Sequence, residues 1–107
     1  MGASFSKNSP SAGWDAAGKT VLITGASAGI GAELARKFAE RGANLALLAR
    51  NKANLEAVAK ECLAAGSARA EIFLCDLTKD EETNAAVGSA AKSFKSFDVV
   101  ILNAGRS

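Results

Sequence analysis

The chain has 107 residues, of which 49% are apolar and 6% aromatic, so it is long enough to bury one core. The 13 basic and 11 acidic residues leave a net charge of +2 without a block of cations, which disfavours nucleic-acid binding through charge. With no histidine in the chain, the two cysteines are not expected to bind a metal.

Cys62 and Cys75 are therefore predicted to be free, buried thiols in a reducing compartment. No apolar run approaches the roughly 20 residues that a membrane span needs, and no secretory leader is visible. These features together predict a cytoplasmic protein.

Residues 1–17 (MGASFSKNSPSAGWDAA) are rich in Ser, Gly and Ala and show no hydrophobic period, which predicts a flexible N-terminal tail. The first six residues match the M-G-x-x-x-[ST] pattern, so Gly2 is a candidate site of N-myristoylation. One acyl chain beside Lys7 would give only weak, reversible membrane association. The alternative is a chance match, which such tails readily produce.

After the tail, strand and helix patterns begin to alternate. Thr20–Thr24 (TVLIT) is an apolar, β-branched run typical of a strand covered on both faces. After a glycine-rich turn, apolar side chains recur at helical spacing, and they are predicted to form the buried face of a helix that Gly42 ends. These side chains are Ile30, Leu34, Ala35, Phe38 and Ala39.

The second unit consists of a strand over Leu45–Ala49 and a helix that Asn51 can cap and Gly66 can end. A third strand is predicted over Glu71–Cys75, and a fourth over Asp98–Leu102. The buried side of the second helix is predicted to comprise Leu55, Val58, Ala59, Cys62 and Leu63.

A third helix is predicted between these last two strands. The sequence Thr78-Lys79-Asp80-Glu81 has the spacing of a capping box and predicts where that helix begins. The helix is weakly amphipathic, with Gly88 inside it, and its inward side chains are predicted to be Ala86, Val87, Ala90 and Phe94.

Residues 18–107 are thus predicted to form a partial dinucleotide-binding domain of the α/β class. The order βαβαβαβ predicts a Rossmann-like, doubly wound parallel sheet with strand order 3-2-1-4. The first two helices should cover one face and the third helix the other. The fourth strand would then be an apolar edge, which is an aggregation hazard, so the sequence indicates a domain that was meant to continue.

The segment Thr24–Gly31 (TGASAGIG) follows the first predicted strand and leads into a helix. Gly25 permits a sharp exit from the strand, Gly29 allows a pyrophosphate to approach the backbone, and Gly31 allows close packing. The phosphates would sit at the helix N-terminus, where unpaired N–H groups attract anions. The alternative is an ordinary tight turn, but the strand before it and the helix after it favour a cofactor site.

The TGxxxGIG spacing also resembles that of the short-chain dehydrogenase/reductase family, over residues 18–107. Asp76-Leu77 after the third strand and Asn103-Ala104-Gly105 after the fourth strengthen the resemblance, although Leu102 stands where the family often has a second Asn. The resemblance implies that Asp76 binds the adenine amino group and that the Asn-Ala-Gly triplet steadies the sheet and lines the cofactor ribose. The cofactor-binding residues expected are Gly25, Ser27, Gly29, Ile30, Gly31, Arg50, Asp76, Leu77, Asn103, Ala104 and Gly105.

The end of the second strand bears on the choice of cofactor. NAD-preferring folds carry an acidic residue there, whereas this chain has Ala49 followed by Arg50. A guanidinium can bind a 2′-phosphate that a carboxylate would repel. By resemblance, Arg50 is the NADP determinant and Ser27 assists it; the alternative is a solvated arginine at a helix start.

The resemblance implies an NADP-dependent oxidoreductase that transfers hydride between NADPH and a carbonyl or alcohol. The family's catalytic Ser and YxxxK segment have no counterpart here, because the chain contains no tyrosine. We therefore expect a portion truncated before the catalytic Ser, Tyr and Lys, and inactive alone. One alternative is a non-catalytic NADP-binding module that docks on a partner chain, or self-associates, through its open sheet edge. Another is a decayed fragment that neither folds nor binds.

Overall fold

The computed structural model describes residues 15–103 and confirms the alternation of strands and helices. The four strands form one parallel sheet in the order β3-β2-β1-β4, as predicted. None of the helices in the described part of the chain is both long and apolar enough to cross a membrane. The elements are β1 (Thr20–Thr24), α1 (Gly29–Glu40), β2 (Asn44–Ala49), α2 (Lys52–Ala65), β3 (Ala70–Leu74), α3 (Asp80–Phe94) and β4 (Val99–Ile101).

Three of the residues singled out from the sequence, namely Gly2, Ala104 and Gly105, lie outside the described residues. Ala16, which belongs to the segment predicted as a tail, is described and is buried.

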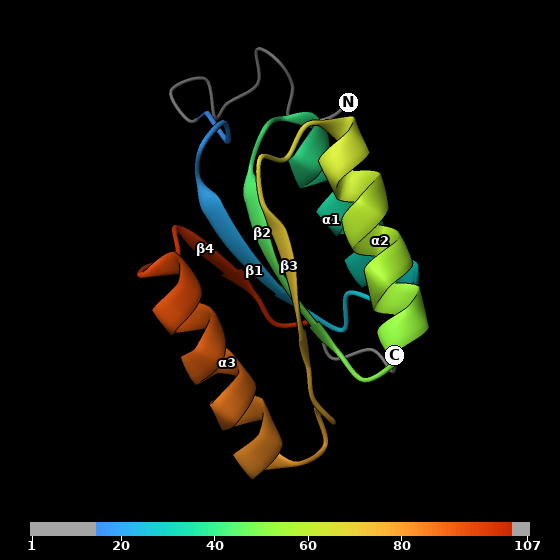
Figure 1. The fold of residues 1–107 in the computed structure, drawn as a ribbon, viewed down its shortest axis with the longest axis vertical. Helices are drawn as coiled ribbons and strands as arrows, with labels where there is room; N and C mark the ends of the chain where they lie inside the picture. The colour runs from blue at the N-terminus through green and yellow to red at the C-terminus, as the bar shows by residue number, and fades with distance from the viewer. Residues whose placement is uncertain (1–14, 104–107) are drawn as a thin grey trace.

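Helices cover both faces of the sheet. Helices α1 and α2 lie side by side on one face, and α3 lies alone on the other (Figure 1). Successive side chains of a strand point to opposite faces, so Val21 and Ile23 pack in the α1–α2 layer and Leu22 packs in the α3 layer. The central strands β1 and β2 are therefore buried on both faces, which explains their nearly continuous apolar sequences.

The predicted ends of α2 are confirmed, but the predicted start of α3 is wrong. The Asn51 side chain accepts a hydrogen bond of 2.9 Å from the Asn54 N–H, and Gly66 ends the helix with a φ of +148°. Thr78 does not cap α3, because its hydroxyl donates to Asp76 Oδ1 at 2.6 Å instead. Helix α3 begins at Asp80, one residue later than a Thr78 cap would start it.

Two side chains predicted on buried helix faces are exposed. Ile30 in α1 is 70% exposed, and Leu63 in α2 is 48% exposed. Helix α1 packs on the sheet through the small residues between its large apolar ones, while Leu34 and Phe38 are only partly buried at the sides. Leu63 lies near the end of α2, beside the edge strand β3. The small buried residues of α1 are Gly31, Ala32, Ala35 and Ala39.

The strand ends also differ from the predictions by one residue in places. Strand β2 begins one residue earlier, β3 spans Ala70–Leu74 rather than Glu71–Cys75, and β4 is limited to Val99–Ile101. Both cysteines are free and buried, as predicted.

A polar cluster joins the edge strand β3 to the end of α3. Arg69 pairs with Glu71, its Nη2 donates to Ser93 Oγ at 2.8 Å, and its guanidinium lies 3.9 Å from the Phe94 ring centroid. Ser93 Oγ donates in turn to Glu71 Oε1 at 2.5 Å. These hydrogen bonds lower the pKa of the Glu71 carboxyl below its ordinary value, the one from Ser93 most and those from Arg69 next. The cluster ties α3 to its face of the sheet.

Candidate functional site

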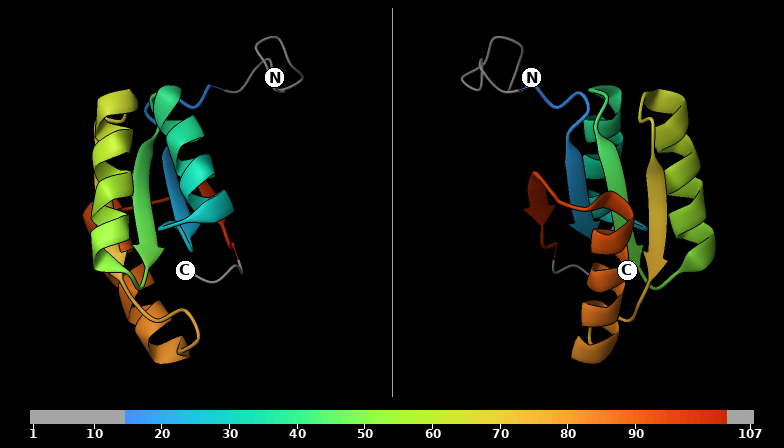
Figure 2. Two further views of the ribbon diagram at one scale, coloured as in Figure 1. Left: turned by 90° about the vertical axis from the view of Figure 1, so that its right-hand side faces the viewer. Right: turned by 60° about the vertical axis from the view of Figure 1, so that its left-hand side comes forward.

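The predicted site residues follow the ends of different strands. Gly25 follows β1, Arg50 follows β2, Asp76 lies two residues after β3, and Asn103 lies two residues after β4. Since the strands are parallel, their carboxyl ends lie at the same end of the sheet, as the arrowheads of β1, β2 and β3 show (Figure 2). Ligands of open α/β sheets bind just beyond the carboxyl ends of the strands.

The glycine-rich loop has the conformation that its sequence predicts. Gly25 and Gly29 have φ angles of +66° and +58°, which side-chain-bearing residues rarely adopt. No described atom lies within 4 Å of a Cβ built on Gly29, so the loop backbone is open to a ligand there. A Cβ on Gly31, by contrast, would lie 2.8 Å from Asn103 Nδ2, so this glycine serves packing. The packing role predicted for Gly31 agrees with this geometry, and the pyrophosphate role of Gly29 stays a prediction.

The N-terminus of α1 is suited to an anion. Its N-cap residue is Ala28, whose methyl side chain cannot accept a hydrogen bond from the first N–H groups, and its first turn carries no acid. The first N–H groups of a helix lack partners within the helix, and the positive end of the helix dipole adds to their attraction for anions. A pyrophosphate group fits this chemistry.

Ser27 carries a buried hydroxyl that has no partner within the described part of the chain. The residue is 5% exposed, and no group among residues 15–103 hydrogen-bonds to its Oγ. A buried hydroxyl usually has a partner, because leaving it unpaired costs about 1–3 kcal/mol. An oxygen-rich ligand at this loop would supply one, so Ser27 fits a phosphate-binding role.

Asn103 connects the end of β4 to the glycine-rich loop. Its backbone N–H donates to Thr24 Oγ1 at 2.9 Å, and its Nδ2 donates to the Gly25 carbonyl oxygen at 3.3 Å. The arrangement agrees with the sheet-steadying role that the resemblance implies for Asn103. Thr24 was not predicted as a site residue, although a hydroxyl at the strand end just before the loop could have indicated it.

Arg50 and Asp76 form an ion pair, with Arg50 Nη1 3.5 Å from Asp76 Oδ2. The Arg50 side chain is 65% exposed and that of Asp76 is 19% exposed, so the cation remains open to a ligand. Hydrogen bonds from the Thr78 hydroxyl and N–H, and then the Arg50 charge, lower the pKa of the Asp76 carboxyl below its ordinary value. The carboxyl is therefore ionised at neutral pH.

The other apolar residues predicted at the site differ in burial. Leu77 is partly buried in the α3 layer, whereas Ile30 projects from the start of α1. The exposure that contradicts a core role for Ile30 leaves it accessible to a cofactor.

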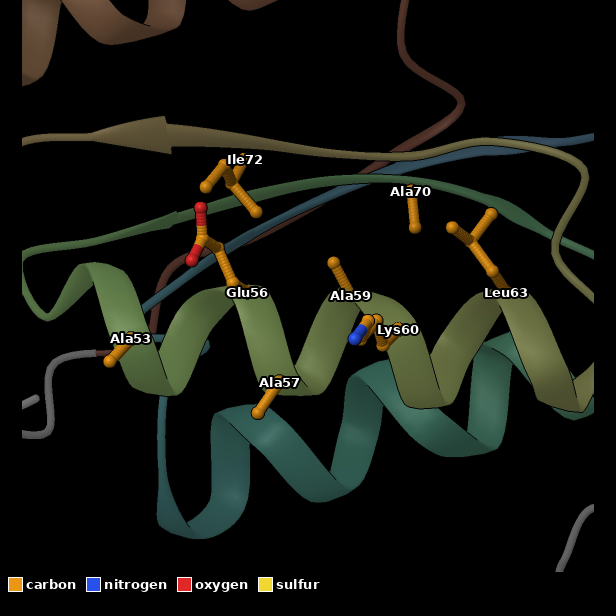
Figure 3. Close-up of a pocket in the computed structure, with 8 residues that line it drawn as sticks. All are labelled: Ala53, Glu56, Ala57, Ala59, Lys60, Leu63, Ala70 and Ile72. Atoms are coloured by element: carbon orange, nitrogen blue, oxygen red, sulfur yellow. The ribbon is translucent and has the colours of Figure 1, made fainter.

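A separate hollow lies between α2 and β3 (Figure 3). Its walls carry Leu63 from α2 and Ala70 and Ile72 from β3, and its charged groups are Glu56 and Lys60. It lies along the flank of the sheet rather than at the carboxyl ends of the strands. None of its lining residues belongs to the glycine-rich loop, so the strand-end site is the better candidate for a dinucleotide.

A protein-family model described as short chain dehydrogenase matches residues 19–107. The chain belongs to the short-chain dehydrogenase family. It is 41% identical over 91 residues to 11-beta-hydroxysteroid dehydrogenase A of Sesamum indicum, covering 85% of this chain and 26% of that relative.

Solved structures of the family agree with the fold. A metagenomic short-chain oxidoreductase in complex with NADP matches with a TM-score of 0.78 and 38% identity, over 86% of this chain and 41% of the other. NADH-dependent reductase A1-R', complexed with NAD, matches with a TM-score of 0.77 and 34% identity, over 85% of this chain and 38% of the other. The short-chain dehydrogenase neighbours thus include complexes with either cofactor.

The chain spans about a quarter of the length of the curated relatives that it matches. The matched part includes the glycine-rich loop and all the strand ends described above.

Proposed function

We propose that this chain is the NADP(H)-binding portion of a short-chain dehydrogenase that transfers hydride between NADPH and a carbonyl or alcohol. The observation that carries the choice of NADP is the exposed Arg50 guanidinium at the end of β2. Ala49 precedes it, so no carboxylate occupies the place where NAD-binding folds hold the ribose hydroxyl. A 2′-phosphate meets a cation there instead of an anion.

The adenosine and pyrophosphate parts of the bound cofactor have candidate partners in this chain. The N–H groups at the start of α1 bind the pyrophosphate, Arg50 and Ser27 bind the 2′-phosphate, and Asp76 accepts from the adenine amino group. Asn103, Ala104 and Gly105 border the ribose, while Ile30 and Leu77 provide apolar contacts. When bound, NADPH supplies the hydride.

The chain alone is proposed to bind the cofactor without turning over a substrate. A general acid must lie within hydrogen-bond reach of the carbonyl oxygen that receives the hydride. The chain contains neither tyrosine nor histidine, and none of its site residues is assigned that role. We assign no residue of this chain to the nicotinamide half of the pocket, so we expect weaker cofactor binding than in a complete enzyme.

A second candidate is a binding module that docks through the sheet edge. Strand β4 pairs with β1 on one side, and no described strand pairs with its other side. Val100 on this strand is 52% exposed and Leu102 just beyond it is 77% exposed. A strand from a partner chain or a second copy could pair here by β-augmentation. If so, sedimentation velocity should detect a complex of the wild-type chain and none of Val100→Lys, and the substitution should leave cofactor binding unchanged.

Thermal melting of the purified chain with millimolar NADPH or NADH tests the main proposal. A ligand that binds only the folded state raises the melting temperature. A cooperative transition that NADPH shifts more than NADH would support an NADP-binding portion. A broad transition that neither cofactor shifts would contradict it.

A further inference from the structure

We propose that Asp76 is a positioning residue that favours the 2′-phosphorylated cofactor by orienting Arg50. The inference rests on the proposed function, in which Arg50 binds the 2′-phosphate. The adenine contact proposed for Asp76 above would be the same for NADPH and NADH. The positioning role is a second role, and it would distinguish the two cofactors.

The pairing of β2 with β3 brings the two side chains together. Ala49 and Leu74 are partners in the register, and the Cys75 N–H donates to the Ala49 carbonyl oxygen at 3.0 Å. The chain therefore leaves both strands side by side, with Arg50 on one and Asp76 on the other. Their ion pair of 3.5 Å follows from this register.

Asp76 is fixed by the loop that leads into α3. Its Oδ1 accepts from the Thr78 N–H at 3.0 Å and from the Thr78 hydroxyl at 2.6 Å. Its backbone N–H donates to Glu82 Oε1 at 2.9 Å, and its carbonyl oxygen accepts from the Lys79 N–H at 2.9 Å. These contacts leave Oδ2 to face the guanidinium of Arg50.

Arg50, in contrast, is a long and mostly exposed side chain whose conformational freedom is lost when it binds a ligand. Orienting it beforehand reduces that loss, and this is how preorganisation raises affinity. A guanidinium carries five N–H donors, so the contact through Nη1 leaves donors for a phosphate. An exposed ion pair contributes little to stability, so the effect should appear in cofactor preference rather than in folding.

The sign of the effect separates positioning from charge alone. A carboxylate near a 2′-phosphate repels it, so if Asp76 acted only through its charge, its neutralisation would strengthen NADPH binding relative to NADH. If Asp76 positions Arg50, neutralisation has the opposite result.

The test is a titration of the chain with NADPH and with NADH at fixed ionic strength. Asp76→Asn keeps an oxygen for Thr78 but removes the anion that faces Arg50. We expect the NADPH-to-NADH affinity ratio to fall about three- to tenfold, the size expected for ordering one long side chain. Asp80→Asn, an equal charge change in the first turn of α3, should not lower the ratio.

Two further variants keep the test decisive if Asp76→Asn fails to fold. Thr78→Val retains the Asp76 charge but removes the hydroxyl that holds it, so the ratio should fall by a smaller factor. In an Arg50→Ala background, neither substitution should lower the ratio, because Asp76 favours NADPH only through Arg50.

An equal loss for both cofactors in Asp76→Asn, or a higher ratio, would overturn the positioning role. If Arg50→Ala itself leaves the ratio unchanged, or the chain binds neither cofactor, the proposed function fails and the inference fails with it. A selective loss in Arg50→Ala alongside an unselective Asp76→Asn overturns the inference alone.

Discussion

The carbonyl oxygen of Gly25 would lie only 2.2 Å from a Cβ built on Gly31. The end of β1 and the first turn of α1 are therefore in direct backbone contact, which holds the glycine-rich loop between them. Both contacting atoms belong to the main chain or to a rigid Cβ, so a side-chain movement cannot relieve this clash.

Gly31→Ala should destabilise the chain by about 2 kcal/mol or more, since it forces the strand and helix apart. Alanine is favoured over glycine inside helices by roughly 1 kcal/mol, so helix propensity alone predicts the opposite sign. Gly88→Ala is the matched control, because no described atom lies within 4 Å of its Cβ. It should stabilise the chain by about 0.5–1 kcal/mol. Urea unfolding of both variants checks this, and equal effects would contradict the packing role of Gly31.

Ser27→Ala should leave the stability of the cofactor-free chain unchanged or slightly raised, because the hydroxyl it removes is buried without a described partner. Ser67→Ala should cost about 1–2 kcal/mol, because the Ser67 hydroxyl donates to the Ala43 carbonyl oxygen at 2.6 Å. Calorimetric titration with NADPH should also show a loss of about tenfold for Ser27→Ala and none for Ser67→Ala. Unchanged NADPH binding by Ser27→Ala would remove this residue from the site.

Glu71 should make the stability of the chain depend on pH. Its pKa is lowered in the folded chain by Ser93 and Arg69, so its contribution is present above the ordinary glutamate pKa of 4.5. The contribution is lost as the pH falls below that value toward the lowered pKa of the folded state. Glu71→Gln should therefore destabilise the chain at neutral pH and show a smaller difference from wild type in acid. Urea midpoints at several pH values check this, with Glu56→Gln as an exposed control; a pH-independent difference would contradict it.

The two cysteines should resist thiol reagents while the chain is folded. Burial raises the pKa of Cys62 to about 11, and burial also raises the pKa of Cys75. The thiolate is the reactive form, so neither residue should react at mildly alkaline pH. Labelling with a chromogenic disulfide should detect no thiol in the native chain and two in concentrated urea. Rapid labelling of the native chain would show that this core opens readily.

Much of the fold could be predicted because each element has a strong local pattern. The apolar runs of β1 and β2 identify buried parallel strands, and Asn51 and Gly66 mark the ends of α2. Ile30 and Leu63 were misplaced because periodicity predicts the direction of a helix face but not its width. In α1 that face consists of small residues, so the larger Ile30 remains outside it.

The site residues could be predicted one at a time, but their interactions depend on tertiary structure. Spacing alone suggested that Thr78 caps α3, and only the structure shows that Asp76 takes its hydroxyl. The Arg50–Asp76 ion pair likewise depends on the β2–β3 register, and the Thr24–Asn103 contact on the pairing of β1 with β4.

The most direct test of NADP recognition uses the adenosine end of the cofactor alone. Binding of adenosine 2′,5′-bisphosphate and of AMP should be measured by calorimetry for the wild-type chain, Arg50→Ala and the surface control Lys60→Ala. The wild type and Lys60→Ala should bind the bisphosphate at least about tenfold more tightly than AMP. Arg50→Ala should lose about 1.5–3 kcal/mol for the bisphosphate and little for AMP, since only one ligand carries the 2′-phosphate. Equal affinity of the wild type for both ligands, or an equal loss for both in Arg50→Ala, would contradict the proposal that this chain recognises NADP through Arg50.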